Sequence, residues 1–349
     1  MTRPPVRIGV VGCGAIGSWH ARILAERPDA LLAALVDTDA GRAQQLAGRL
    51  GVPAWTDLNM ALAEAALDAL VIATPEAAHA DNAEAAATAG CALLIEKPVA
   101  TDLAGVDRIA AAAAAAQVPV MAAHVERFEA GSALLVDALR EGACGRVVSV
   151  CARRQFAPGE AGRFSGSSST LRVLGVHDFD LLRWVHPAPV AEVHAVAGRG
   201  AVFERTGLDD HVVTTIRFAD GAVGLVESAW TLPGPYADWP VPSAWGPAGN
   251  NRLDVFGDAG MLSNDMGLRG QQLVAFDEVH GFRAAGLRHQ PVVHGRVGGA
   301  LAAQTGHFLA VVRGETVPVA GLEDARRAIA LTEAAERSLA VGAPAVPAA

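Results

Sequence analysis

The chain has little basic charge. It contains 28 Lys and Arg against 37 Asp and Glu, which gives a formal net charge of -9, and its basic residues form no run. A chain of this charge repels phosphate backbones and anionic lipid head groups. We therefore expect neither nucleic acid nor a membrane surface as a partner.

Long apolar runs are also missing. No uninterrupted apolar stretch reaches the roughly 18 residues of a membrane-spanning helix, and the longest candidate is an alanine tract at 110–116. The first residues, MTRPPVR, contain no apolar core of a secretion signal. We expect a cytoplasmic protein.

Cysteines are few and show no metal-binding or disulfide spacing. The four cysteines are Cys13, Cys91, Cys144 and Cys151. They form no C-x-x-C pair and no dense scaffold, so we expect reduced, mostly buried thiols. Among the 11 histidines, His289 and His294 are close in sequence, but no Cys, Asp or Glu lies nearby to complete a ligand set. No metal site is predicted.

Aromatic residues make up only 5% of the 349 residues, whereas apolar residues make up 51%. Such a chain can bury a large core and typically forms two domains. Up to about residue 124, runs typical of strands alternate with runs typical of helices. The expected strands are 6–12, 31–37, 67–75, 91–98 and 118–125, and the expected helices are 18–28, 40–51, 78–90 and 103–117. This alternation predicts a doubly wound parallel α/β sheet.

The pattern changes after residue 124. Strand-like segments predominate, with hairpin turns expected at 219–221 and 257–260. The expected strands are 145–156, 190–200, 211–230 and 251–263, and the expected helices are 131–141, 177–185, 302–313 and 322–340. We predict an α/β domain at 1–123 and an α+β domain with a largely antiparallel sheet at 124–349.

Three glycines stand between the first strand and the first helix. In G-x-G-x-x-G, Gly12 makes the tight turn, Gly14 lets the backbone approach a pyrophosphate, and Gly17 lets the helix pack on the strand. The helix N-terminus then faces the phosphates. Asp37 ends the second strand, 20 residues after Gly17, where a carboxylate binds the adenosine ribose hydroxyls. The alternative is a glycine turn followed by an acidic helix cap.

These positions predict a Rossmann domain that binds NAD. The carboxylate of Asp37 would repel a 2′-phosphate, and neither Thr38 nor Asp39 provides a positive charge beside it. NAD is therefore expected rather than NADP.

Longer segments resemble the Gfo/Idh/MocA oxidoreductases, which include glucose-fructose oxidoreductase and inositol dehydrogenase. The resemblance covers nearly the whole chain, through GVVGCGAIGSWHARIL, LVDTDAGRAQQLAGRLG, CALLIEKPVATDL, GRVVSVCARR, LGVHDFDLLRWV and VFGDAGML. It implies a Rossmann domain followed by an open sheet whose outer face joins subunits into a homodimer or homotetramer. It also implies NAD(P)-linked oxidation or reduction of a sugar or cyclitol hydroxyl.

Lys97 is the first candidate catalytic residue. Glu96, Lys97 and Pro98 follow a parallel strand at the sheet edge where ligands bind. The resemblance implies that Lys97 contacts the reacting hydroxyl and the nicotinamide ribose, where a cation stabilises an alkoxide-like oxygen. It implies that Glu96 lines the cofactor pocket, although a helix cap or a surface charge is an equal alternative. The predicted cofactor-binding residues are Gly12, Gly14, Ala15, Ile16, Gly17, Asp37, Thr38, Thr74, Pro75, His79, Glu96 and Lys97.

His177 is the second candidate. It precedes Asp180 by three residues at a helix start, so both side chains project from one face. Histidine exchanges protons near neutral pH and suits a general base or acid. Asp180 orients His177, binds a substrate hydroxyl or caps the helix. Many family members carry Asp four residues before this histidine, where this chain has Val173.

Several charged residues outside these motifs are candidates for substrate recognition. Arg153, Arg154 and Arg163 are candidates for a cleft, together with His124, Glu126 and Arg127, and surface ion pairs are the alternative. Their charge suits a carboxylate or a sugar nucleotide. Residues 230–250 carry three tryptophans and five prolines and either stack on a sugar or pack on a neighbouring subunit.

Three functions fit this sequence. The leading hypothesis is NAD-dependent hydride transfer to or from a hydroxyl-bearing carbon of a sugar, sugar acid, cyclitol or sugar nucleotide. The second, prompted by Val173, is a redox-neutral elimination or epimerisation through a transient ketone. The third is a non-catalytic, NAD-binding regulatory protein.

Overall fold

The structure, a computed structural model, describes residues 3–166, 168–232, 250–266, 274–277, 281–284 and 291–348. The chain forms two compact units. The first comprises 1–128 and 292–326, and the second comprises 129–291 and 327–349. The return of 292–326 to the first unit depends on contacts between distant parts of the sequence. The boundary predicted after residue 123 stays a prediction.

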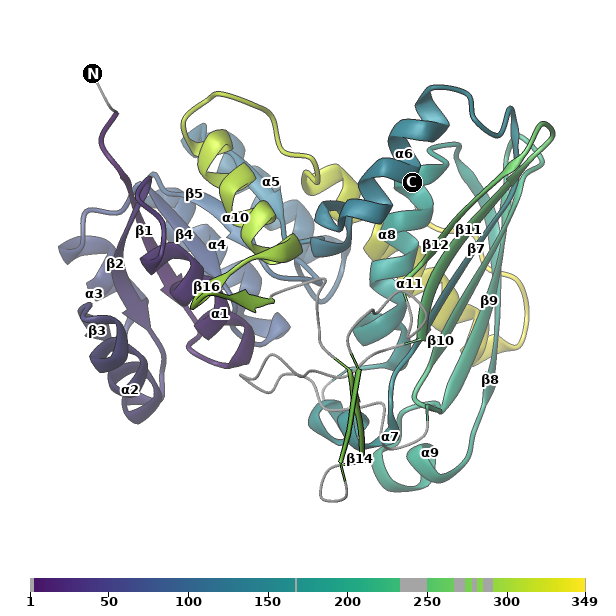
Figure 1. Ribbon diagram of the computed structural model, residues 1–349, viewed down its shortest axis with the longest axis horizontal. Helices are drawn as coiled ribbons and strands as arrows, with labels where there is room; N and C mark the ends of the chain where they lie inside the picture. The colour runs from purple at the N-terminus through teal and green to yellow at the C-terminus, as the bar shows by residue number, and fades with distance from the viewer. Residues whose placement is uncertain are drawn as a thin grey trace. The chain divides into compact units, whose positions relative to one another are not determined.

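The first unit is built on a parallel sheet of six strands (Figure 1). Its strands are β1 (Val6–Val11), β2 (Ala30–Val36), β3 (Ala54–Trp55), β4 (Ala69–Ile72), β5 (Ala92–Ile95) and β6 (Val120–Ala122). Their order, β3-β2-β1-β4-β5-β6, is that of a dinucleotide-binding fold. β4 and β5 are apolar and buried throughout, as strands covered on both faces must be. The doubly wound sheet is confirmed, whereas the two-residue β3 was too short to predict.

Helices cover both faces of this sheet. They are α1 (Ala15–Ala25), α2 (Ala40–Leu50), α3 (Leu58–Glu64), α4 (His79–Thr88), α5 (Leu103–Ala116) and α10 (Gly299–Val312), and a small pair, β15 (Val292–Val293) and β16 (Arg296–Val297), precedes α10. Asp39 and Asp102 cap α2 and α5 by accepting main-chain N–H bonds. Side chains of α1, α2 and α10 share one core with β1. On the other face, α4 packs on β4 and β5.

The second unit contains a mixed sheet. Its strands are β7 (Val147–Gln155), β8 (Val190–Gly198), β9 (His211–Phe218), β10 (Val223–Ala229), β11 (Asn250–Gly257) and β12 (Met261–Asp265), and a separate hairpin is formed by β13 (Val274–Asp277) and β14 (Gly281–Ala284). Only β7 and β10 pair in parallel within the order β12-β11-β7-β10-β9-β8. The largely antiparallel sheet and both predicted hairpin turns are confirmed.

Three helices pack on one face of this second sheet (Figure 1). The helices of the second unit are α6 (Ala130–Arg140), α7 (Pro158–Ala161), α8 (Val176–Val185), α9 (Ala201–Thr206) and α11 (Leu322–Val341), which starts in the first unit. Side chains of α6, α8 and α11 share a core with alternate residues of the strands. On the opposite face, Val223 and Val196 are 50% and 56% exposed.

Candidate active site

The glycine turn between β1 and α1 has the geometry of a phosphate cradle. Gly12 has φ +90°, and a Cβ there would lie 2.4 Å from the carbonyl oxygen of Ala73. A Cβ on Gly17 would lie 1.8 Å from the carbonyl oxygen of Gly12, whereas one on Gly14 would meet nothing within 4 Å. Gly12 and Gly17 are thus required by the fold, and Gly14 borders open space. No side chain caps the N-terminus of α1, which begins at Ala15 and Ile16. This turn fits a pyrophosphate.

Asp37 lies directly after β2 and is 5% exposed. Its Oδ2 accepts the N–H of Cys13 at 2.8 Å and its Oδ1 accepts the N–H of Asp39 at 2.9 Å. These bonds tie the carboxylate to the glycine turn, while Thr38 is exposed beside it. Arg42, on α2, approaches both carboxylate oxygens at 3.3 and 3.2 Å. Neither Thr38 nor Asp39 supplies a positive charge beside Asp37, which comes from Arg42 instead.

The turns that follow β4 and β5 are joined by His79, the first residue of α4. Its Nε2 lies 2.8 Å from the carbonyl oxygen of Thr74, and its Nδ1 lies 2.9 Å from that of Pro98. The His79 side chain is 1% exposed, so it is enclosed by the residues that it connects. Pro75 and Lys97 belong to the two turns that it connects.

Glu96 makes a buried pair with a histidine that no sequence motif indicates. His20 Nε2, on α1, donates to Glu96 Oε1 at 2.9 Å, and the His20 side chain is fully buried. The main-chain N–H of Lys97 donates to Glu96 Oε2 at 3.3 Å. Burial raises the pKa of Glu96, but the hydrogen bond and attraction from His20, with the charge of Lys97, outweigh it and hold the pKa below its usual value. The pair connects α1 to the turn that carries Lys97.

In the second unit, His177 follows a π-helical stretch, Leu171–Gly175, that leads into α8. Such stretches are frequent at functional sites. His177 is half-buried, and Asp180, on the same face of α8, is 1% exposed. Val173 is buried in an apolar cluster with Leu174 and Trp230. Valine at this position is therefore part of the packing.

The arginines proposed for substrate recognition have structural partners. Arg154 is 2% exposed and forms a two-bond ion pair with Asp178 of α8, both bonds measuring 3.0 Å. Arg153, on the opposite face of β7, pairs with Glu227 at 2.8 Å. These pairs match the surface-pair alternative for Arg153 and a buried structural role for Arg154.

The remaining candidates are also paired or lie elsewhere. Arg163 pairs with Glu160 at 3.0 Å, and Arg127 pairs with Asp324 at 3.0 Å within the first unit. His124 and Glu126 are buried. Most of the Trp- and Pro-rich segment 230–250, together with His289, lies outside the described residues.

Comparison with known protein families adds an independent finding. A family described as an oxidoreductase family with an NAD-binding Rossmann fold matches residues 6–124. The C-terminal domain of the same family, Gfo/Idh/MocA, matches residues 133–263. The chain belongs to the Gfo/Idh/MocA oxidoreductase family. Its first unit is therefore an NAD-binding Rossmann domain, and the chain is an oxidoreductase that acts on CH–OH groups.

Individual Gfo/Idh/MocA proteins are similar to this chain over long stretches of its sequence. Myo-inositol 2-dehydrogenase of Thermotoga maritima is 28% identical over 339 residues, which cover 96% of each chain. An NAD⁺-dependent scyllo-inositol 2-dehydrogenase of Bacillus subtilis is 30% identical over 241 residues, 65% of this chain and 68% of that protein. The crystal structure of a probable dehydrogenase from Thermotoga maritima has a TM-score of 0.82 at 26% identity, covering 98% of this chain and 99% of that one.

In this family member, the predicted cofactor residues follow strands β1, β2, β4 and β5 of the first sheet, whereas His177 and Asp180 belong to the second unit. His20, Arg42 and the partnership of Arg154 with Asp178 were missed by sequence reasoning. Arg42 had a usable signal, since it stands one helical turn beyond the Asp39 cap. Among the described residues, no helix is long and apolar enough to span a bilayer.

Proposed function

We propose that this Gfo/Idh/MocA protein is an NAD-dependent dehydrogenase that oxidises a ring hydroxyl of a cyclitol to a ketone. Its preferred cyclitol in this proposal is an inositol. The observation that carries the proposal is the cradle of Gly12, Gly14 and Gly17 tied to Asp37 through Cys13. The cyclitol is suggested by the inositol 2-dehydrogenase that matches 96% of the chain.

The residues of the first unit account for cofactor binding. The N-terminus of α1 would hold the pyrophosphate and Asp37 the adenosine ribose, with Thr38, Thr74 and Pro75 beside them. When bound, NAD supplies the acceptor for the hydride. Glu96 and His79 hold the turns that present this edge of the sheet.

Two side chains carry the proton chemistry of the proposal. Lys97 stabilises the negative charge that develops on the substrate oxygen. His177 accepts the hydroxyl proton, and Asp180 orients it or binds a neighbouring hydroxyl. With Val173 in the packing cluster, Lys97 and His177 act without the additional Asp of many family members. We expect Lys97→Met to abolish turnover while NADH binding is retained. We expect His177→Ala to lower kcat about 10²-fold or more.

The test is NADH formation at 340 nm with NAD and separate inositol isomers, sugars and sugar nucleotides. The proposal expects the highest kcat/KM with an inositol isomer. A higher value with a sugar nucleotide would contradict the cyclitol assignment. Product without net NADH would favour the redox-neutral alternative, and bound NADH without any product would favour a non-catalytic protein.

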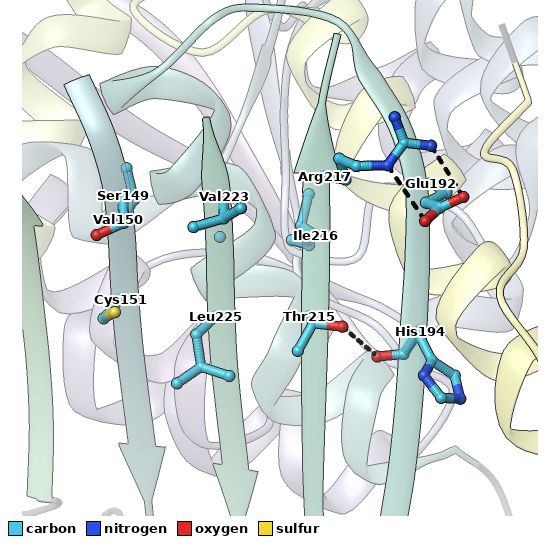
Figure 2. Close-up of a pocket in the computed structure, with 11 residues that line it drawn as sticks. Ser149, Val150, Cys151, Glu192, His194, Thr215, Ile216, Arg217, Val223 and Leu225 are labelled. Carbon is cyan, nitrogen blue, oxygen red and sulfur yellow. Dashed lines mark hydrogen bonds and ion pairs between the residues drawn. The ribbon is translucent and has the colours of Figure 1, made fainter. Parts of the chain in front are cut away.

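We also propose that the enzyme is a homodimer or homotetramer, joined through the outer face of the second sheet. Figure 2 shows residues that line a pocket on this face, where Val223 lies next to Arg217, which pairs with Glu192 at 3.0 Å, and Leu225 lies opposite Thr215. Apolar residues that are exposed together on one sheet face are typical of a surface that another subunit covers. Light scattering at micromolar concentration should give a dimer or tetramer, and a monomer would refute the proposal.

We propose a cytoplasmic location because the cysteines are free thiols. All four are free thiols, and Cys13, Cys91 and Cys144 are buried. Burial, followed by the charge of Asp37, raises the pKa of Cys13 to about 11, which keeps the thiol neutral and unreactive. Cell fractionation that found the protein outside the cytoplasm would contradict this location.

A further inference from the structure

The carboxylate of Asp37 has its inner side fixed by backbone donors. The N–H groups of Cys13 and Asp39 bind Oδ2 and Oδ1 at 2.8 and 2.9 Å. The first donor belongs to the glycine turn and the second to the start of α2, so neither can move away without disturbing the fold. The outer side of the carboxylate is covered by the guanidinium of Arg42.

Arg42 is held there weakly. Its Nη1 lies 3.3 and 3.2 Å from the two oxygens of Asp37, and its Nη2 lies 3.4 Å from Asp39 Oδ2. Charge-assisted hydrogen bonds are normally about 2.7–2.9 Å. The Arg42 side chain is also 51% exposed, against 5% for Asp37. The guanidinium can therefore leave these long contacts at little cost and turn toward an incoming anion.

We propose that Arg42 is a specificity-determining residue that admits NADP as a second, weaker cofactor. A 2′-phosphate placed against Asp37 would be repelled by its charge, and Asp39 adds to that repulsion. A guanidinium can bind the phosphate with two parallel N–H hydrogen bonds and so offset part of this repulsion. NAD, with a 2′-hydroxyl, uses the carboxylate itself and depends less on Arg42. This inference rests on the NAD site of the proposed function.

The experiment measures binding rather than turnover. NADH and NADPH are titrated separately into the purified full-length protein and followed by nicotinamide fluorescence. The variants are Arg42→Gln and, as a control that removes the same charge from the same helix, Arg49→Gln. We expect Arg42→Gln to raise the Kd for NADPH about tenfold or more, because a charged two-bond contact is lost. The Kd for NADH should stay within about twofold, and Arg49→Gln should leave both Kd values within that range.

Salt provides a second readout. Binding of NADPH to the unchanged protein should weaken more steeply with NaCl than in Arg42→Gln, because a surface charge contact is screened. An equal rise in both Kd values would overturn the proposal, since Arg42 would then only order Asp37. Absence of NADPH binding at millimolar concentration, or an unchanged Kd for NADPH in Arg42→Gln, would overturn it too. Failure of NADH itself to bind would instead refute the proposed function.

Discussion

Gly14 and Gly17 separate two requirements of the glycine turn, cofactor space and folding. Gly17→Ala places a methyl 1.8 Å from a carbonyl oxygen, so we expect it to lower the free energy of unfolding by about 1–3 kcal/mol or more. Gly14→Ala meets nothing within 4 Å, so stability should stay within about 0.5 kcal/mol. Its methyl does occupy the space through which a pyrophosphate must approach. The Kd for NADH should therefore rise about tenfold or more.

The measurements are urea unfolding and NADH titration. Gly48→Ala, on α2, is the matched control, because its methyl also meets nothing within 4 Å and its helix position favours alanine. It should leave NADH binding unchanged. Unchanged NADH binding in Gly14→Ala as well would contradict the assignment of this turn to the pyrophosphate.

Glu96 gives a prediction for pH. Because its pKa in the folded protein lies below its usual value, the folded state favours the ionised carboxylate. The resulting stability is present above the unfolded-state value of about 4.3 and is lost as the pH falls through the lower folded-state value. Glu96→Gln should remove this acid-dependent loss. Urea unfolding from neutral to acid pH tests it against Glu141→Gln, a control at an exposed position that should keep the slope of the unchanged protein.

Between secondary-structure elements, the buried Arg154–Asp178 ion pair connects α8 to β7. Removing one partner leaves a buried charge, so Asp178→Asn should lower the free energy of unfolding by about 3–5 kcal/mol. The double variant Arg154→Met with Asp178→Leu should recover most of that loss. Arg153→Met breaks a half-exposed pair on the opposite face and should cost about 1 kcal/mol or less. Equal losses for Arg153→Met and Asp178→Asn in urea unfolding would contradict this account.

Elements with strong local patterns were predictable from the sequence. The buried strands β4 and β5, the glycine turn and the helix end at Gly51 each carry a signal within a few residues. Contacts between distant residues carry none. Nothing near Phe308 indicates that it packs on the core of β1, and nothing near His20 indicates its bond to Glu96. The π-helical stretch before α8 was likewise missed, since the predicted helix began only at residue 177.

Site residues could be predicted where a sequence motif determines their chemistry. They were missed where their role depends on how distant elements pack together. Gly12 and Asp37 follow from a fixed spacing, and their contacts in the structure fit that use. Arg154 was considered for substrate binding because it is charged, whereas its burial against Asp178 depends on how α8 packs on the sheet. The roles of Lys97, His177 and Asp180 remain proposals.

For the whole molecule, the proposed reaction is the oxidation of a cyclitol by NAD bound to the Rossmann domain. Its central claim is that a hydride moves directly from a cyclitol carbon to NAD. Mass spectrometry tests this claim with myo-inositol that carries deuterium on the oxidised carbon. We expect deuterium in the NADH formed by the unchanged protein and no NADH with Lys97→Met. Deuterium released to water, with unlabelled NADH, would contradict it.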